Sequence, residues 1–203
     1  MKTILIFGDS IVYGASDEEK GGWINRLRLF LESNQDIEVY NLGICGDNTK
    51  LVLKRFENEV NARWGQDDRE LIIIFSVGAN DTQYVKDMGN RIKIGSFEKN
   101  IRLLKEKAEK YTKKVIFCGL NDVDEKKSNP IPWNNKISYL SNEIKKYDEV
   151  LKKFCMQNKV KFIEIIGLVR KEDLADGLHP NSKGHEKIFK KVRDFLSRGA
   201  ILR

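Results

Sequence analysis

Five short apolar runs recur along the chain, and each is followed by a stretch with helical periodicity. The runs cover residues 2–7, 38–42, 71–77, 114–120 and 161–166. Continuous apolar runs of this length are typical of parallel strands that are buried on both faces. Apolar residues at helical spacing, with charged residues between them, occupy 23–32, 49–64, 97–111, 137–157 and 182–198. Strands that alternate with helices predict βαβ units with right-handed crossovers. We therefore expect an α/β fold, a three-layer α/β/α sandwich on a five-stranded parallel sheet, as one domain over residues 1–203.

Four short blocks of glycine and polar residues stand directly after these runs or in the last loop. The blocks are Gly8-Asp9-Ser10, Asn41-Leu42-Gly43, Gly78-Ala79-Asn80-Asp81 and Asp176-Gly177-Leu178-His179-Pro180. Ligands of open α/β sheets bind outside the carboxyl ends of the strands, where these blocks are expected to meet. Two long loops, 82–95 and 121–136, also follow strand ends and should border the same pocket.

The residue types in these blocks suit acyl transfer. A serine hydroxyl needs a base to take its proton, and the base needs a partner that orients it. Ser10, His179 and Asp176 can supply these three groups, and Asp176 stands three residues before the histidine. The reaction also needs donors for the developing oxyanion, which the Gly43 N–H and the Asn80 side-chain amide can supply.

Each of these residues also has a purely structural interpretation. An isolated Ser10 would be read as a helix cap, Gly43 as a turn glycine and Asn80 as an Asx-turn residue. Only the presence of all four blocks favours a site. We expect Asp9 to bond its own loop, and we expect His185, the second of two histidines, to be structural.

The ordered blocks resemble the SGNH (GDSL-type) hydrolase family, whose name denotes the residues matched by Ser10, Gly43, Asn80 and His179. The similarity extends to Gly21-Gly22-Trp23, to Gly46-Asp47-Asn48-Thr49 and to the final block with Gly184-His185, and so covers nearly the whole chain. One departure is small, since Ser10 is followed by Ile11 where the family name has leucine.

The resemblance implies a flavodoxin-like sheet and a serine esterase that works through an acyl-enzyme. It implies Ser10, Asp176 and His179 as catalytic residues, and the Ser10 N–H as a third oxyanion donor beside Gly43 and Asn80. Substrates would be small-molecule esters, with short acyl groups favoured by the lack of large insertions. Lysophospholipids, thioesters and O-acetylated carbohydrates stay open as alternatives, as does a catalytically silent binding protein on the same fold.

Other function classes find less support in the sequence. A phospho-acceptor module built on Asp9 would need further acidic groups beside it and a lysine after the fifth strand, where Gly167-Leu168 stands. No P-loop glycine-lysine motif occurs. A phosphatase that resembles acid phosphatases would need more histidines. The net charge of +7 is compatible with nucleic-acid binding. However, the lysines are interleaved with glutamates, as is usual for solvated helix faces, which argues against that function.

Cysteine usage and the N-terminal residues suggest a cellular location. Three widely spaced cysteines, Cys45, Cys118 and Cys155, favour a reducing compartment over a disulfide framework. No C-x-x-C pair occurs, and we expect neither a metal nor a cofactor. We expect Cys45, two residues past Gly43, to be a small buried residue. No signal peptide or membrane helix is evident, so we expect a cytoplasmic protein without stable membrane insertion. The oligomeric state is left open.

Overall fold

Five parallel strands form the central sheet. The computed structural model describes residues 2–33, 36–64 and 69–198. The strands are β1 (Lys2–Gly8), β2 (Ile37–Gly43), β3 (Glu70–Ser76), β6 (Val115–Cys118) and β8 (Lys161–Ile163). They lie in the order β2-β1-β3-β6-β8, and every neighbouring pair is parallel. This confirms the expected sheet. The strand order reverses direction at β1 and β3, which is where a crevice opens in folds of this kind.

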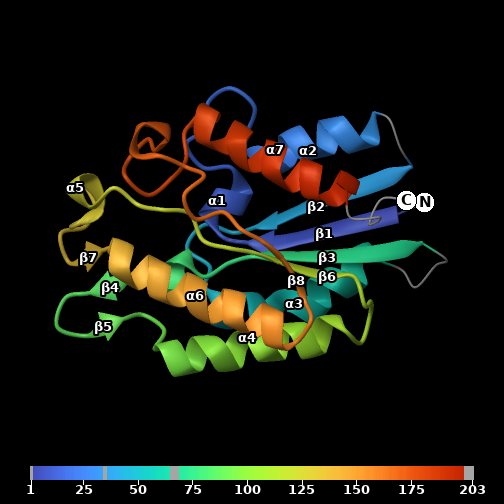
Figure 1. Cartoon of the computed structure of the whole chain (residues 1–203), viewed down its shortest axis with the longest axis horizontal. Helices are drawn as coiled ribbons and strands as arrows, with labels where there is room; N and C mark the ends of the chain where they lie inside the picture. Colours follow the sequence, from blue (N-terminus) through green and yellow to red (C-terminus); the bar gives the residue numbers. More distant parts are fainter. Residues whose placement is uncertain (1, 34–35, 65–68, 199–203) are drawn as a thin grey trace.

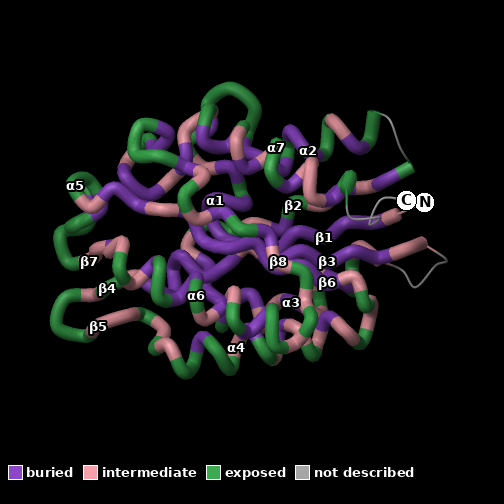
Figure 2. Tube along the Cα trace, in the orientation of Figure 1, coloured by how far each residue is buried: buried purple, intermediate pink, exposed green. Residues whose placement is uncertain are grey.

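Helices cover both faces of the sheet (Figure 1). The helices α2 (Trp23–Glu32) and α7 (Ser182–Arg198) lie on one face, and α3 (Thr49–Arg63), α4 (Ile94–Ala108) and α6 (Ser141–Gln157) lie on the other. Successive side chains of a strand point to opposite faces. Ile4 and Ile6 of β1 therefore pack in the core under α2 and α7, and Leu5 and Phe7 pack under the other three helices. Figure 2 shows the strands as the most continuously buried part of the chain.

The pattern misplaced the bounds of several elements. The helix expected over 97–111 begins three residues earlier, at Ile94, and ends at Ala108. The helix expected from residue 137 begins at Ser141, because Ile137–Ser138 forms a strand, β7. The strands expected at 114–120 and 161–166 are shorter than the apolar runs that predicted them. Except at the start of α4, the apolar pattern extends beyond the hydrogen-bonded element.

A second, smaller sheet lies beyond the carboxyl ends of the main strands (Figure 1). It is antiparallel, in the order β5-β4-β7, with β4 at Tyr84–Val85 and β5 at Gly89–Asn90. The strands β4 and β5 come from the first of the two segments expected as long loops, and β7 directly follows the second, in residues expected to begin a helix. Pairing between segments some fifty residues apart leaves no periodic signal in either segment, so the local pattern does not predict this sheet. Among the described helices, none combines the length and apolar character needed to cross a bilayer.

Candidate active site

Ser10 is the first residue of a short helix, α1 (Ser10–Tyr13), that follows β1 without a linker. Asp9 caps this helix, since its Oδ1 accepts a hydrogen bond from the Ile11 N–H at 3.0 Å. That contact gives Asp9 the loop-bonding role expected of it. The cap and the strand together hold Ser10 in a tight turn at the carboxyl edge of the sheet.

Ser10, His179 and Asp176 lie in hydrogen-bond contact. The Ser10 Oγ is 2.9 Å from the His179 Nε2, and the His179 Nδ1 is 2.6 Å from the Asp176 Oδ2. The other carboxylate oxygen accepts the backbone N–H groups of Leu178 and His179 at 2.9 and 2.8 Å. Because Nδ1 faces a carboxylate, it carries the ring proton, which leaves Nε2 to accept the proton of the serine hydroxyl.

The contacts of Asp176 keep it ionised. Burial raises the pKa of its carboxyl group, but the hydrogen bonds from the His179 ring and backbone outweigh this, so that the pKa lies below its ordinary value. An ionised carboxylate is the form that orients the imidazole and stabilises an imidazolium when one forms. The three groups can therefore move a proton off Ser10 and return it.

The Asn80 amide lies in a single 3₁₀ turn (Ala79–Asp81) that follows β3. Its Nδ2 donates to the Asp47 carbonyl at 2.9 Å, and its Oδ1 accepts from the Tyr139 hydroxyl at 2.6 Å. One N–H of the amide is thereby used within the protein, and among the described residues the second has no acceptor and is available to a ligand. Asn80 lines the same cavity as Ser10 and His179.

Gly43 is not placed as expected. Its N–H donates to the Asn41 Oδ1 at 2.9 Å, and it is not among the residues that line the cavity. A Cβ at this position would lie 2.2 Å from the Tyr13 nitrogen. The glycine therefore lets the turn that carries Ser10 pack over the end of β2. The close approach of Tyr13 therefore explains why a glycine stands at the end of this strand.

Gly46 occupies the position beside the cavity instead. It lines the cavity with Ser10 and Asn80, at a φ of +83° that favours glycine. Its carbonyl accepts from Arg91 at 2.9 Å, and no hydrogen bond within the described chain occupies its N–H. The signal that could have found it is its own block, Gly46-Asp47-Asn48-Thr49, in which the glycine stands two residues before the Asn48 cap of α3.

The cavity around Ser10 and His179 has a volume of about 340 Å³. Both long loops contribute to its wall, Gln83 from the first and Ile131, Trp133 and Asn134 from the second. Cys45 also lines it and is exposed, which corrects the expectation of a small buried residue. The residues from Ile44 to Gly46 follow the end of β2 outside the sheet, so Cys45 has no core to enter.

Trp133 stands beside the histidine at the mouth of this cavity. Its ring is stacked on that of His179, with centroids 6.0 Å apart and an interplanar angle of 26°. The residue is 58 % exposed. A large aromatic surface is thus open to solvent directly beside the group that moves the proton. Trp133 lies in the loop 121–136 that the sequence predicts to border the pocket, but its contact with His179 depends on the tertiary structure.

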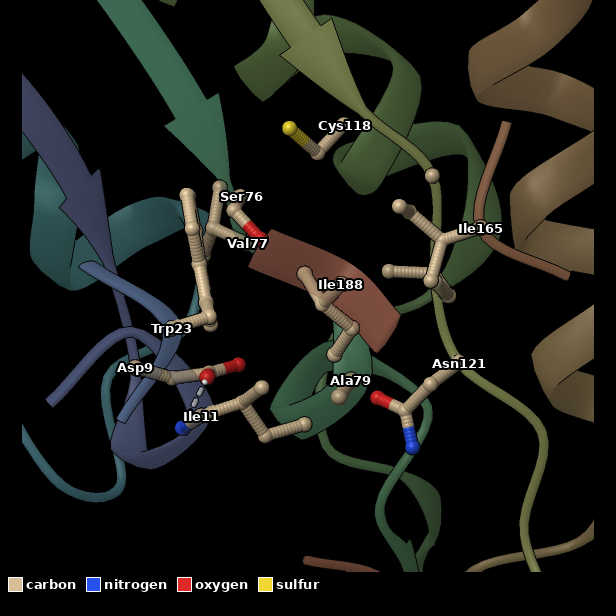
Figure 3. Close-up of a pocket in the computed structure, with 12 residues that line it drawn as sticks. Asp9, Ile11, Trp23, Ser76, Val77, Ala79, Cys118, Asn121, Ile165 and Ile188 are labelled. Carbon is tan, nitrogen blue, oxygen red and sulfur yellow. Dashed lines mark hydrogen bonds between the residues drawn. The ribbon is translucent and has the colours of Figure 1, made fainter. Parts of the chain in front are cut away.

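A second, much smaller cavity of about 20 Å³ lies under the turn (Figure 3). Asp9 reaches it between Ile11 and Trp23, and Figure 3 shows one of its carboxylate oxygens bonded to the Ile11 N–H and the other turned toward the cavity. Apolar side chains such as Ile165 and Ile188 form much of the wall. This burial raises the pKa of Asp9 from 3.8 to about 6, against the lowering effect of the Ile11 N–H.

His185 and Asp81 have structural contacts. The His185 ring is fully buried, accepts from the Trp23 N–H at its Nδ1 and bonds the Ala15 carbonyl through Nε2. Asp81 accepts from the Thr49 N–H and hydroxyl at 2.9 and 2.5 Å, which ties the Asn80 turn to the start of α3. The described residues bring together no group of three or more His, Cys, Asp or Glu side chains able to hold a metal ion.

Comparison with known proteins identifies the family. A family model described as GDSL-like lipase/acylhydrolase matches residues 4–192. The chain belongs to this family. None of the curated proteins compared matches the sequence significantly. The expected resemblance is therefore confirmed at the level of the family, and the chain is a GDSL-type hydrolase by descent.

Solved structures of GDSL hydrolases have the same fold. A member of the lipolytic G-D-S-L family from Veillonella parvula is 20% identical, with a TM-score of 0.76 over 98% of this chain and 100% of that one. An esterase from Pseudoalteromonas, solved inhibited by monoethylphosphonate, is 18% identical, with a TM-score of 0.74 over 98% and 99% of the two chains. A catalytic mutant of an acetylxylan esterase from Geobacillus stearothermophilus is 18% identical, with a TM-score of 0.71 over 97% and 93%.

Proposed function

We propose that this GDSL-type hydrolase is a serine esterase that cleaves carboxylic esters with small or short acyl groups. The observation that carries the proposal is the continuous contact from the Ser10 Oγ through the His179 ring to Asp176, at 2.9 and 2.6 Å. A serine in a helix cap alone would not need a histidine at its hydroxyl. The family membership supports hydrolysis of an ester rather than another acyl transfer.

The proposed reaction has two halves. Ser10 attacks the ester carbonyl while His179 accepts its proton, and the carbonyl π electrons move to the oxygen. The N–H groups of Ser10 and Gly46 and the free N–H of Asn80 stabilise this oxyanion, Gly46 taking the role first assigned to Gly43. The tetrahedral species collapses, and His179 protonates the departing alcohol. Water, deprotonated by His179, then releases the acid from Ser10.

The thiol of Cys45 is a poorer candidate nucleophile. Partial desolvation of the sulfur, together with the nearby Asp9, raises the pKa of this thiol above its ordinary value. The thiolate is the reactive form, so a raised pKa leaves less of it near neutral pH. In addition, the His179 Nε2, the nitrogen that accepts a proton, is hydrogen-bonded to the Ser10 hydroxyl and not to the thiol of Cys45.

A carbohydrate O-acetyl ester is a second candidate substrate, favoured by one observation. The exposed face of Trp133 beside His179 is an amphipathic aromatic surface. Such a surface suits a sugar ring, which has apolar C–H faces, and would hold it with an acetyl group at Ser10. Acetylated sugars and simple short esters would place the same kind of acyl group at Ser10, and they differ in the alcohol group that the rest of the site must hold.

The test of the reaction uses the intact protein. Purified wild-type chain and Ser10→Ala are assayed on p-nitrophenyl esters from acetate to octanoate, with Ser96→Ala, an exposed helical serine, as the matched control. We expect the highest kcat/KM at short chains, no turnover by Ser10→Ala and wild-type turnover by the control. A fluorophosphonate should label Ser10. Full activity of Ser10→Ala, or label on Cys45, would refute the mechanism.

The test of the alcohol side compares Trp133→Ala with the wild type. On an acetylated xylose we expect a raised KM, and on methyl acetate, which has no ring to stack, an unchanged one. Equal effects on both would remove the argument for a sugar. We also propose a cytoplasmic location, which the free cysteines Cys45, Cys118 and Cys155 support.

A further inference from the structure

Three polar side chains form a hydrogen-bonded series that ends at the cavity around Ser10. The Gln83 Nε2 donates to the Tyr139 hydroxyl at 2.9 Å, and that hydroxyl donates to the Asn80 Oδ1 at 2.6 Å. Asn80 then donates through Nδ2 to the Asp47 carbonyl at 2.9 Å. Tyr139 is 2 % exposed, so its hydroxyl is hydrogen-bonded to these two side chains in place of water.

The direction of every hydrogen bond in the series follows from chemistry. The Asp47 carbonyl can only accept, which requires the nitrogen of the Asn80 amide on that side and the oxygen on the side of Tyr139. The tyrosine hydroxyl must then donate to this oxygen. It has one proton, so it can only accept from Gln83. Burial raises the pKa of Tyr139 above its ordinary value, which keeps that proton in place.

The small antiparallel sheet fixes the hydroxyl. Tyr84 pairs with Ser138 and Val85 with Ile137, so Gln83 and Tyr139 are the next residues along the two strands. The Tyr139 backbone is held as well, since its N–H donates to the Ser128 carbonyl and its carbonyl accepts from the Ser128 hydroxyl, at 2.9 and 2.8 Å. The sheet thus brings a rigid donor to an amide that follows a different strand of the main sheet.

An asparagine amide needs such a partner to serve as an oxyanion donor. The terminal torsion of asparagine is broad and roughly two-fold, so the side chain alone does not distinguish oxygen from nitrogen. An amide turned by half a rotation would present a carbonyl oxygen to the developing negative charge. A donor held at the position of the Asn80 Oδ1 raises the energy of the turned amide, because the donor would then face the NH2 group in place of the oxygen.

We propose that Tyr139, supported by Gln83 and the β4–β7 pairing, is the positioning residue that orients the Asn80 amide toward the reacting carbonyl. The proposal rests on the proposed esterase function. It gives the small sheet a role in rate as well as in shaping the cavity. Tyr139 and Gln83 both line the cavity, but the role proposed for Tyr139 is exercised through Asn80 and not through contact with the substrate.

The experiment measures steady-state kinetics of Tyr139→Phe on p-nitrophenyl acetate. The ring is kept and the hydroxyl lost, so we expect kcat to fall about 5- to 50-fold while KM changes less than about 2-fold, because the amide acts mainly on transition-state charge. Gln83→Leu should lower kcat less, by about 2- to 5-fold, since the hydroxyl is still present. The control is Tyr147→Phe, another buried tyrosine whose hydroxyl donates to the Ile92 carbonyl outside the cavity; its kcat should match the wild type.

A double mutant separates positioning from general support of the fold. In an Asn80→Ala background, Tyr139→Phe should cause no further loss of kcat, because there is no amide left to orient. An additional loss of the same size in that background would overturn the proposal, as would wild-type kcat in Tyr139→Phe. The rate at which a fluorophosphonate labels Ser10 gives a readout that does not depend on the ester chosen, and it should fall in Tyr139→Phe.

The outcomes also separate this proposal from the esterase function itself. Retained activity in Ser10→Ala would refute the esterase mechanism. An active wild type with an inactive Ser10→Ala and a fully active Tyr139→Phe would refute only the positioning role. Should Tyr139→Phe fold poorly by circular dichroism, Gln83→Leu decides, and its unchanged kcat would refute the role.

Discussion

Asp9 makes the stability of the protein depend on pH in a direction opposite to that of most carboxylates. Its side chain is 2 % exposed beside a cavity with largely apolar walls, and burial raises its pKa from 3.8 to about 6. The perturbation is Asp9→Asn, which removes the ionisation and keeps an oxygen that can accept from the Ile11 N–H. In the wild type, the native state holds its proton between about pH 4 and pH 6, where the unfolded state has already released it.

The sign and the magnitude follow from this difference in proton binding. Stability falls with rising pH wherever the native state binds more protons. The contribution of Asp9 is therefore fully present below about pH 4 and is lost as pH rises through about 6. A rise in pKa from 3.8 to about 6 corresponds to about 3 kcal/mol, at about 1.4 kcal/mol per pH unit. The stability of Asp9→Asn relative to the wild type should climb by about that amount between pH 4 and pH 7.

The assay is urea unfolding of both proteins at steps from pH 4 to pH 8. The contributions of the other titrating groups cancel in the difference between the two stabilities. Asp17→Asn is the control, because hydrogen bonds from Arg26 and Ser182 outweigh burial and lower the pKa of Asp17. The stabilisation linked to Asp17 is present above about pH 4 and is lost only at lower pH, so the difference in stability between Asp17→Asn and wild type should stay nearly flat from about pH 5 to pH 8. If the difference in free energy of unfolding between Asp9→Asn and wild type stays flat from pH 4 to pH 7, the pKa of Asp9 is not raised.

Two further predictions concern the packing around the site. Arg26→Ala removes one partner of a buried ion pair with Asp17 and should lower the free energy of unfolding in urea by about 3–5 kcal/mol, whereas Arg28→Ala, in an exposed pair, should cost less than about 1 kcal/mol. Equal losses would contradict the burial argument. Gly43→Ala places a Cβ 2.2 Å from the Tyr13 nitrogen and should destabilise by about 1–3 kcal/mol, seen as a lower Tm, and lower the activity as α1 shifts. An unchanged Tm with lost activity would instead return Gly43 to the oxyanion hole.

The residues of the candidate site differ in how far the sequence could predict them. Ser10, Asn80, Asp176 and His179 stand after strand ends or in the last loop, and parallel strands bring their carboxyl ends to one edge, so their meeting follows from the strand pattern. Gly43 shows the limit. A glycine after a strand can donate an N–H or can permit a close approach, and only the position of Tyr13 distinguishes the two.

The local pattern determined the five parallel strands, the two helix-covered faces and the order of the polar blocks, because burial on both faces and helical periodicity are written into consecutive residues. The tertiary structure decided what depends on pairing between distant segments. Ile137 and Ser138 were expected to open a helix, yet they pair with β4 and bring the Tyr139 hydroxyl to Asn80. Trp133 meets His179, and Cys45 enters the cavity wall, for the same reason. Such contacts depend on where two loops end in space, and no periodicity within either loop records that.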